Sequence, residues 1–148
     1  MQNTMNELLE MGIIPIVNEN DSVVTDEIEI GDNDNLSALV ADMVDADLLV
    51  LFSDIDGLYN SDPHFNKLAK KLDVVTDIDE IKNMAGDSAT KQGTGGMITK
   101  IEAAERATNA GIHMVIANGN NVAALYDILE GKPAGTLFVS KNFRKEQD

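Results

Sequence analysis

The sequence GTGGMITKIEAAERATNAGIHMVIANG, residues 93–119, contains the pattern that decides the fold. After the glycines, apolar residues recur at helical spacing from Ile98 to Ala107, which predicts one buried helix face. Gly111 follows that face and is a typical residue at which a helix ends. The apolar run at 113–117 is typical of a buried strand. A helix that leads directly into a buried strand predicts a sheet covered by helices.

The glycines that open this stretch also suggest a ligand site. Gly93, Gly95 and Gly96 let the backbone approach a ligand closely, because no Cβ stands in the way. A helix that begins there gathers N–H donors and the positive end of a dipole, which favours phosphate. The stretch fits neither GxxxxGK[ST] nor GxGxxG. Taken alone, it is equally compatible with a phosphate site and with a plain surface turn.

The rest of the chain alternates strands and helices in the same way. Acidic and apolar residues alternate over 26–30, which could form a hairpin strand. Residues 4–7 have the pattern of a capping box, which marks the start of a helix. The predicted strands are 13–17, 47–52, 72–75, 113–117 and 136–139. Two predicted helices begin at Thr4 and Asp34. Three more helices are predicted at 78–85, 98–108 and 122–129. We expect Asp34 to cap its helix, and the apolar residues of 122–129 to lie inside. The order predicts a three-layer αβα sandwich around a mostly parallel sheet.

Polar residues follow three of the predicted strands. They lie at 18–21, at Ser53 and Asp54, and at Asn118 and Gly119, while the glycine loop precedes a helix of the same kind of unit. Ligands on such sheets bind at the carboxyl ends of the strands. These four loops are therefore expected to converge on one edge of the sheet, which isolated surface turns would not do.

Length and composition exclude several classes of protein. A chain of 148 residues with 43% hydrophobic content is expected to form one domain. A formal net charge of −15 argues against a nucleic-acid-binding surface, which needs clustered Lys and Arg. No apolar run approaches the ~20 residues that span a bilayer, and the first residues lack the pattern of a signal peptide. The absence of cysteine fits a reducing cytoplasm.

Other candidate sites are weaker. The segment Asp54-Ile55-Asp56-Gly57 superficially suggests a calcium loop, but the EF-hand spacing and its terminal glutamate are absent. His64 and His113 stand alone in the sequence, and His113 begins a predicted strand, so we assign it a structural role and predict no histidine metal site.

Four motifs occur in one order along the chain: IPIVNEND (14–21), GDNDNLSA (31–38), SDIDGLY (53–59) and GTGGMITK (93–100). Together they resemble the amino acid kinase family, and within it the members that phosphorylate the γ-carboxylate of glutamate. The resemblance covers nearly the whole chain. One departure is Leu51-Phe52-Ser53-Asp54, where many relatives have LLTD.

The resemblance implies the fold of the amino acid kinases, also described as acetylglutamate kinase-like. Residues 1–140 are similar to the C-terminal, nucleotide-binding part of that kinase domain together with part of the glutamate site. Residues 141–148 form a polar tail, and the PUA domain of many relatives is not part of the chain. The family's opening strand, glycine-rich loop and lysine are also not part of it, so we expect the isolated chain to be nearly inactive and to self-associate.

The resemblance further implies transfer of a phosphoryl group from ATP to L-glutamate, giving L-glutamyl 5-phosphate, the first step of proline biosynthesis. Asp21 and Asn33 are then expected to bind glutamate, although Asp21 could instead close an Asx turn. Asp34 is expected to organise catalytic lysines, and Lys100 to act on the β- and γ-phosphates. The implied nucleotide contacts are Ser53, Asp54, Thr94, Gly95, Gly96, Met97, Ile98, Thr99 and Lys100.

The implied co-substrate is ATP with Mg²⁺, to which we assign no protein ligand because phosphate oxygens and water can supply the coordination. The implied setting is the cytoplasm, with no nucleic acid or membrane partner and a homo-oligomer in the intact enzyme. A second hypothesis from another class is a non-catalytic nucleotide-binding fragment of the same kinase.

Overall fold

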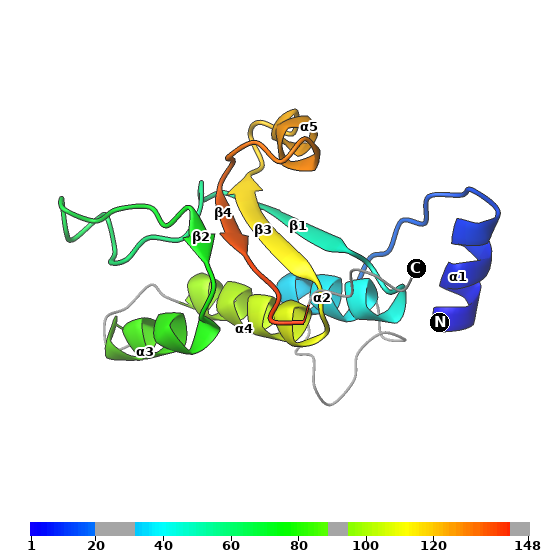
Figure 1. Ribbon diagram of the computed structural model, residues 1–148, viewed down its shortest axis with the longest axis horizontal. Helices are drawn as coiled ribbons and strands as arrows, with labels where there is room; N and C mark the ends of the chain where they lie inside the picture. Colours follow the sequence, from blue (N-terminus) through cyan, green and yellow to red (C-terminus); the bar gives the residue numbers. More distant parts are fainter. Residues whose placement is uncertain (20–31, 89–94, 143–148) are drawn as a thin grey trace.

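The computed structural model describes residues 1–19, 32–88 and 95–142. Helices and strands alternate along most of this length (Figure 1). In chain order the elements are α1 (Gln2–Glu10), α2 (Asn33–Met43), β1 (Leu48–Ser53), β2 (Val74–Val75), α3 (Ile78–Ser88), α4 (Gly95–Asn109), β3 (His113–Asn118), α5 (Ala124–Leu129) and β4 (Thr136–Phe138).

The four strands form one mixed sheet in the order β1-β3-β4-β2. β1 and β3 are parallel, in a register that pairs Leu48 with His113 and Ser53 with Asn118. β2 and β4 are also parallel, whereas β3 and β4 are antiparallel. The predicted mostly parallel α/β sheet is therefore confirmed, with one antiparallel pairing in the middle.

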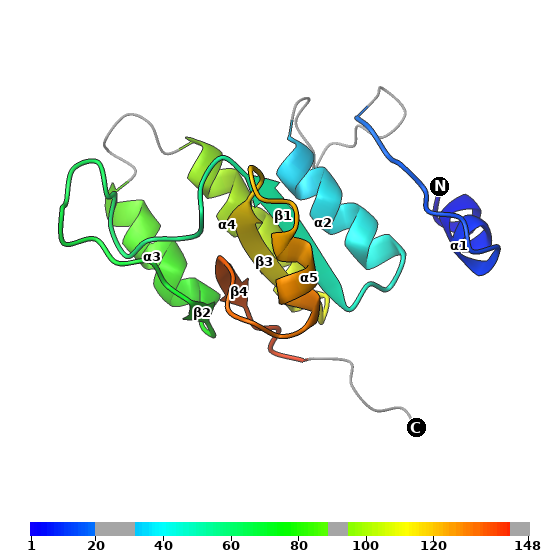
Figure 2. The ribbon, with the colours of Figure 1, turned by 90° about the horizontal axis from the view of Figure 1, so that it is seen from above.

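Helices α2, α3 and α4 lie together on one side of the sheet, and α5 lies on the other (Figures 1 and 2). Ala104 and Ala107 of α4 and Ala38 of α2 are fully buried in one core cluster. Alanine leaves little bulk between two helices, so α2 and α4 can approach closely. In the described residues α5 is the only element of the third layer, and α1 stands apart from the sheet.

The core fixes β3 and β4 tightly against each other. Met114 and Ile116 of β3 and Phe138 of β4 are fully buried. Gly135 precedes β4 with φ +65°, and a Cβ on it would lie 1.8 Å from the carbonyl oxygen of Ile116. Only glycine fits this contact, since any side chain would require the two strands to move apart.

A single hydroxyl closes the long connection between β1 and β2. Thr136 is fully buried, and its Oγ1 accepts a hydrogen bond from the N–H of Leu58 at 2.8 Å. The same hydroxyl donates to the carbonyl oxygen of Leu72 at 2.5 Å. The N–H of Leu72 donates to the carbonyl oxygen of Leu58 at 2.8 Å. Both ends of the excursion over residues 58–72 are thereby joined to β4.

The predicted strand at 13–17 is wrong. These residues form no ladder with the rest of the described chain, and Ile14 and Ile16 are 87% and 96% exposed. An apolar run becomes a strand only when a neighbouring strand pairs with it, and Pro15 offers no N–H for such pairing. The possible hairpin strand at 26–30 lies outside the described residues.

Two further expectations about helices and burial are also wrong, and β1 is only partly buried. α1 begins at Gln2, so Thr4 lies inside the helix, and no side chain caps it. The apolar side chains near α5 are exposed: Val122 and Leu129 are each 66% exposed. β1 is buried mainly at Leu51, whereas Phe52 is 39% exposed, so the strand is not covered on both faces.

Candidate functional site

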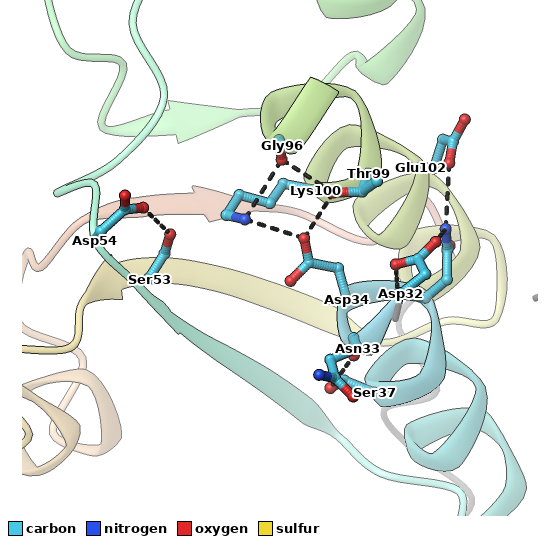
Figure 3. A network of polar contacts seen from close by, with 11 residues as sticks. Asp32, Asn33, Asp34, Ser37, Ser53, Asp54, Gly96, Thr99, Lys100 and Glu102 are labelled. Carbon is cyan, nitrogen blue, oxygen red and sulfur yellow. Dashed lines mark hydrogen bonds and ion pairs between the residues drawn. The ribbon is translucent and has the colours of Figure 1, made fainter. Parts of the chain in front are cut away.

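The carboxyl ends of β1 and β3 lie side by side. Ser53 is paired with Asn118, and the N–H of Gly119 donates to the carbonyl oxygen of Ser53 at 2.7 Å. α2 leads into β1 and α4 leads into β3, so the N-termini of both helices reach this same edge of the sheet. Figure 3 shows Ser53 and Asp54 on the edge toward which Lys100 extends from α4.

An ion pair joins the first turn of α2 to the second turn of α4 at this edge. The ammonium of Lys100 lies 3.0 Å from Oδ2 of Asp34, and the two side chains are only 14% and 23% exposed. Thr99 donates its hydroxyl to the same Oδ2 at 2.8 Å, or alternatively to the carbonyl oxygen of Gly96 at 3.0 Å. The structure therefore brings Asp34, Thr99 and Lys100 into one network (Figure 3).

Asp32, and not Asp34, caps α2. Its Oδ1 accepts a hydrogen bond from the N–H of Asn35 at 3.0 Å. The predicted cap lies two residues too late: α2 begins at Asn33, so a cap must come from position 32. Asp34 lies in the first turn, where a negative charge is favourable and where its carboxylate can reach α4 instead.

A second polar network connects the same two helices. Nδ2 of Asn35 donates to Oδ2 of Asp32 at 2.6 Å and to Oε2 of Glu102 at 3.2 Å. Asn35 is only 7% exposed. The sequence analysis assigned no role to Asn35 or Glu102. The spacing of Asp32 and Asn35, a capping residue and the third helical position, is the signal that could have indicated the pair.

Asn33, Ser53 and Asp54 lie around this edge. Asn33 is exposed at the first position of α2, and its carbonyl oxygen accepts the hydroxyl of Ser37 at 2.7 Å. The hydroxyl of Ser53 donates to Oδ1 of Asp54 at 3.0 Å, and Asp54 is exposed. Asp21 and Thr94 lie outside the described residues.

The first turn of α4 is open toward solvent. Gly95, Gly96, Met97 and Ile98 form this turn, and Ile98 is 38% exposed although its spacing predicted burial. A Cβ on Gly96 would meet no atom within 4 Å, so packing does not require glycine there. The first N–H groups of a helix have no acceptor within the helix. Together with the Lys100 ammonium, this turn can receive an anion.

No helix within 1–19, 32–88 or 95–142 is both long and apolar enough to cross a bilayer. Within the same ranges, no three carboxylate or histidine side chains converge on a point where they could hold a metal ion.

Two helix N-termini and a lysine gathered at the carboxyl edge of an α/β sheet form an arrangement that favours an anion such as phosphate. The family model "Amino acid kinase family" matches residues 1–118, and the chain belongs to this family. Two similar curated relatives are both named glutamate 5-kinase. The one from Clostridium acetobutylicum is 57% identical over 143 residues and the one from Idiomarina loihiensis is 55% identical over 139 residues.

These alignments cover 96% and 93% of this chain but only 54% and 38% of the two relatives, so the chain spans about half of their length or less. Among solved structures, UMP kinase from Bacillus anthracis matches with a TM-score of 0.70 at 19% identity, over 95% of this chain and 52% of that one. Isopentenyl phosphate kinase from T. acidophilum matches with a TM-score of 0.52 at 24% identity, over 71% and 38%. Both likenesses show the amino acid kinase fold.

Proposed function

We propose that this chain is the nucleotide-binding part of a glutamate 5-kinase. The reaction transfers the γ-phosphoryl group of ATP to the γ-carboxylate of L-glutamate and yields L-glutamyl 5-phosphate, the first step of proline biosynthesis. The observation that carries the proposal is the Asp34–Lys100 ion pair at the N-terminus of α4. The names of relatives that are 50–57% identical supply the substrates.

In the proposed reaction an oxygen of the glutamate γ-carboxylate attacks the γ-phosphorus. The bond between that phosphorus and the bridging oxygen of ADP breaks, and ADP leaves with the electron pair. Catalysis of such a transfer depends on positioning and on positive charge around the moving phosphoryl group. The first turn of α4 would hold the phosphates, and Lys100 would place its ammonium on the charge that develops during transfer.

Asp34 has a defined part in this proposal. Its carboxylate fixes the Lys100 ammonium at 3.0 Å and accepts the Thr99 hydroxyl at 2.8 Å. A lysine side chain has several rotatable bonds, so an anchored ammonium loses less freedom when the phosphoryl group arrives. Ser53 and Asp54, at the carboxyl end of β1, would contact the nucleotide beside this pair. Asn33 and Asp21 would bind glutamate.

Mg²⁺ is proposed as the companion of ATP. The described residues do not form a protein cage for the ion. Mg²⁺ usually keeps several waters and binds substrate phosphates with only one or two carboxylates, so such a cage is not required. We therefore assign Mg²⁺ no protein ligand. A cytoplasmic location and assembly into homo-oligomers belong to the same proposal.

The test of the catalytic assignment is Lys100→Met in the full-length protein, assayed by glutamate-dependent ADP release. Losing one donor that acts on developing charge costs roughly a hundred- to a thousandfold in kcat. Lys82→Met is the matched control: Lys82 forms an exposed ion pair with Glu105 of α4 at 2.8 Å, away from the edge of the sheet. Equal rates for the two variants would refute the role of Lys100. A wild-type protein that releases no ADP with glutamate would refute the proposed function itself.

Asn33→Ala tests the acceptor side in the same assay. The substitution is expected to raise the KM for glutamate and to leave the KM for ATP nearly unchanged, since Asn33 lies at the start of α2 and not in the first turn of α4. Equal increases in both KM values would assign Asn33 a structural role instead.

A further inference from the structure

We propose that Asn35 is a positioning residue for phosphoryl transfer. Its buried amide joins Asp32 to Glu102 and so fixes the separation of α2 and α4 at which Asp34 meets Lys100. This inference rests on the proposed function, because it assigns Asn35 a part in the same reaction.

Two bridges connect the start of α2 to the N-terminal half of α4. The first is the Asp34–Lys100 ion pair at the edge of the sheet. The second runs from Asp32 through the amide of Asn35 to Glu102, with contacts of 2.6 and 3.2 Å. Figure 3 places Asp32 and Glu102 on the other side of Asp34 from Ser53 and Asp54. Asn35 and Glu102 of the second bridge line an open groove along α2 and α4, and neither Asp34 nor Lys100 is among the residues that line it.

The chemistry of this bridge requires an amide. The Nδ2 group of asparagine has two hydrogens, and two carboxylate oxygens accept them. A carboxylate at position 35 would offer no hydrogen and would add a third negative charge beside Asp32 and Glu102. A hydrogen bond to a charged group is about twice as strong as a neutral one, so the amide holds both acids firmly.

Asn35 acts through its neighbours rather than on the substrate. It is 7% exposed and follows Asp34 directly in the first turn of α2. Its backbone N–H and its amide both bind the capping Asp32. Loosening this bridge lets the start of α2 shift relative to α4, and a displacement of about 1 Å at a reacting group can cost roughly a hundredfold in rate.

The test is Asn35→Asp, which keeps the shape of the side chain and removes its hydrogens. In the full-length protein we expect kcat to fall roughly ten- to a hundredfold, while the KM values for glutamate and ATP change less than about twofold. Adding Glu102→Gln restores an amide–carboxylate pair between the helices, now with the amide on α4. The double variant is therefore expected to recover several-fold in kcat over Asn35→Asp.

Ser37→Ala is the matched control within α2, because the Ser37 hydroxyl donates to the carbonyl oxygen of Asn33 in its own helix and makes no hydrogen bond to α4 within the described residues. Its kcat should equal that of the wild type. An unchanged kcat in Asn35→Asp, or a double variant no faster than the single one, would overturn the inference.

Hydrogen exchange distinguishes this failure from failure of the proposed function, since it needs no turnover. The helical amides next to the bridge, residues 37–40 of α2 and 102–105 of α4, should exchange severalfold faster in Asn35→Asp than in the wild type or in Ser37→Ala. Unchanged exchange would refute the bridge even if the protein proved to have another activity. Faster exchange in a protein without glutamate-dependent turnover would support the bridge and refute only the proposed reaction.

Discussion

Helices α4 and α5 stand directly before and after β3 in the chain, yet one is largely buried and the other is not. α4 precedes β3 and buries Ile101, Ala104 and Ala107 against the sheet and α2. α5 follows β3, and none of its residues is buried. Both helices were predicted from apolar residues at helical spacing. The difference teaches that periodicity identifies the apolar face of a helix but not the element that covers it.

The largest expected effect comes from comparing two glycines after α5, one with open space around it and one packed against β3. Gly131 and Gly135 follow α5 with φ +75° and +65°, but a Cβ on Gly131 would meet nothing within 4 Å, whereas one on Gly135 would overlap the Ile116 carbonyl. Gly131→Ala should cost roughly 1 kcal/mol, from backbone conformation alone. Gly135→Ala should cost roughly 4 kcal/mol or more, because β3 and β4 must separate. Urea unfolding of the full-length variants measures both. Similar costs would show that Gly135 is not pressed against β3.

A second pair of variants compares the two helices directly. Ile101 of α4 is 4% exposed and Leu129 of α5 is 66% exposed. Ile101→Ala should lower the free energy of unfolding by roughly 2–5 kcal/mol, since it leaves a cavity in the core. Leu129→Ala should change it by less than about 0.5 kcal/mol. A cost at Leu129 close to that at Ile101 would mean that α5 is covered in the full-length protein, and the contrast between the helices would then be lost.

The smallest expected effect concerns pH at the α4 end of β3. The N–H of Ser140 donates to Nδ1 of His113 at 3.0 Å, and burial lowers the pKa of His113 below its ordinary value of about 6.5. The unfolded chain therefore takes up a proton at higher pH than the folded one. The contribution of His113 to stability is complete above about pH 6.5 and is lost as the pH falls through the folded pKa.

His113→Gln should flatten this part of the dependence of stability on pH, measured by thermal unfolding between about pH 7 and 5. Parallel curves for the variant and the wild type would contradict the assignment.

The elements that the sequence predicted correctly are those whose signals are local. The helix after the glycine loop ends near Gly111, with φ +85°, and the buried run after it forms β3. Residues 13–17 carried an equally apolar signal but formed no strand, because strand formation also depends on a partner far away in the sequence. Apolar composition therefore predicted the interior of this sheet better than its boundary.

In the candidate site, too, the residues with a local sequence signal were predictable and the contacts between distant residues were not. Ser53 and Asp54 could be predicted from their position at the end of a strand, and Lys100 from its position shortly after the glycines, near the start of a helix. The contact between Asn35 and Glu102 joins residues that are 67 positions apart. No spacing rule within a helix reports such a contact, since it depends on how two helices pack. Asp34 was misplaced as a cap for a smaller reason, because the helix cap lies two residues earlier, at Asp32.

The hydroxyl of Thr136 has a consequence for engineering. It closes the excursion over residues 58–72 at both ends, so the tip beyond this closure is mechanically separate from Ser53 and Asp54. Phe65 and Leu68 at that tip are 74% and 83% exposed, and in Figure 1 the excursion extends away from the sheet. Exposed tips of this kind tolerate added sequence. The tip thus offers an attachment point for a purification tag or a fluorescent reporter, with the edge of the sheet left undisturbed.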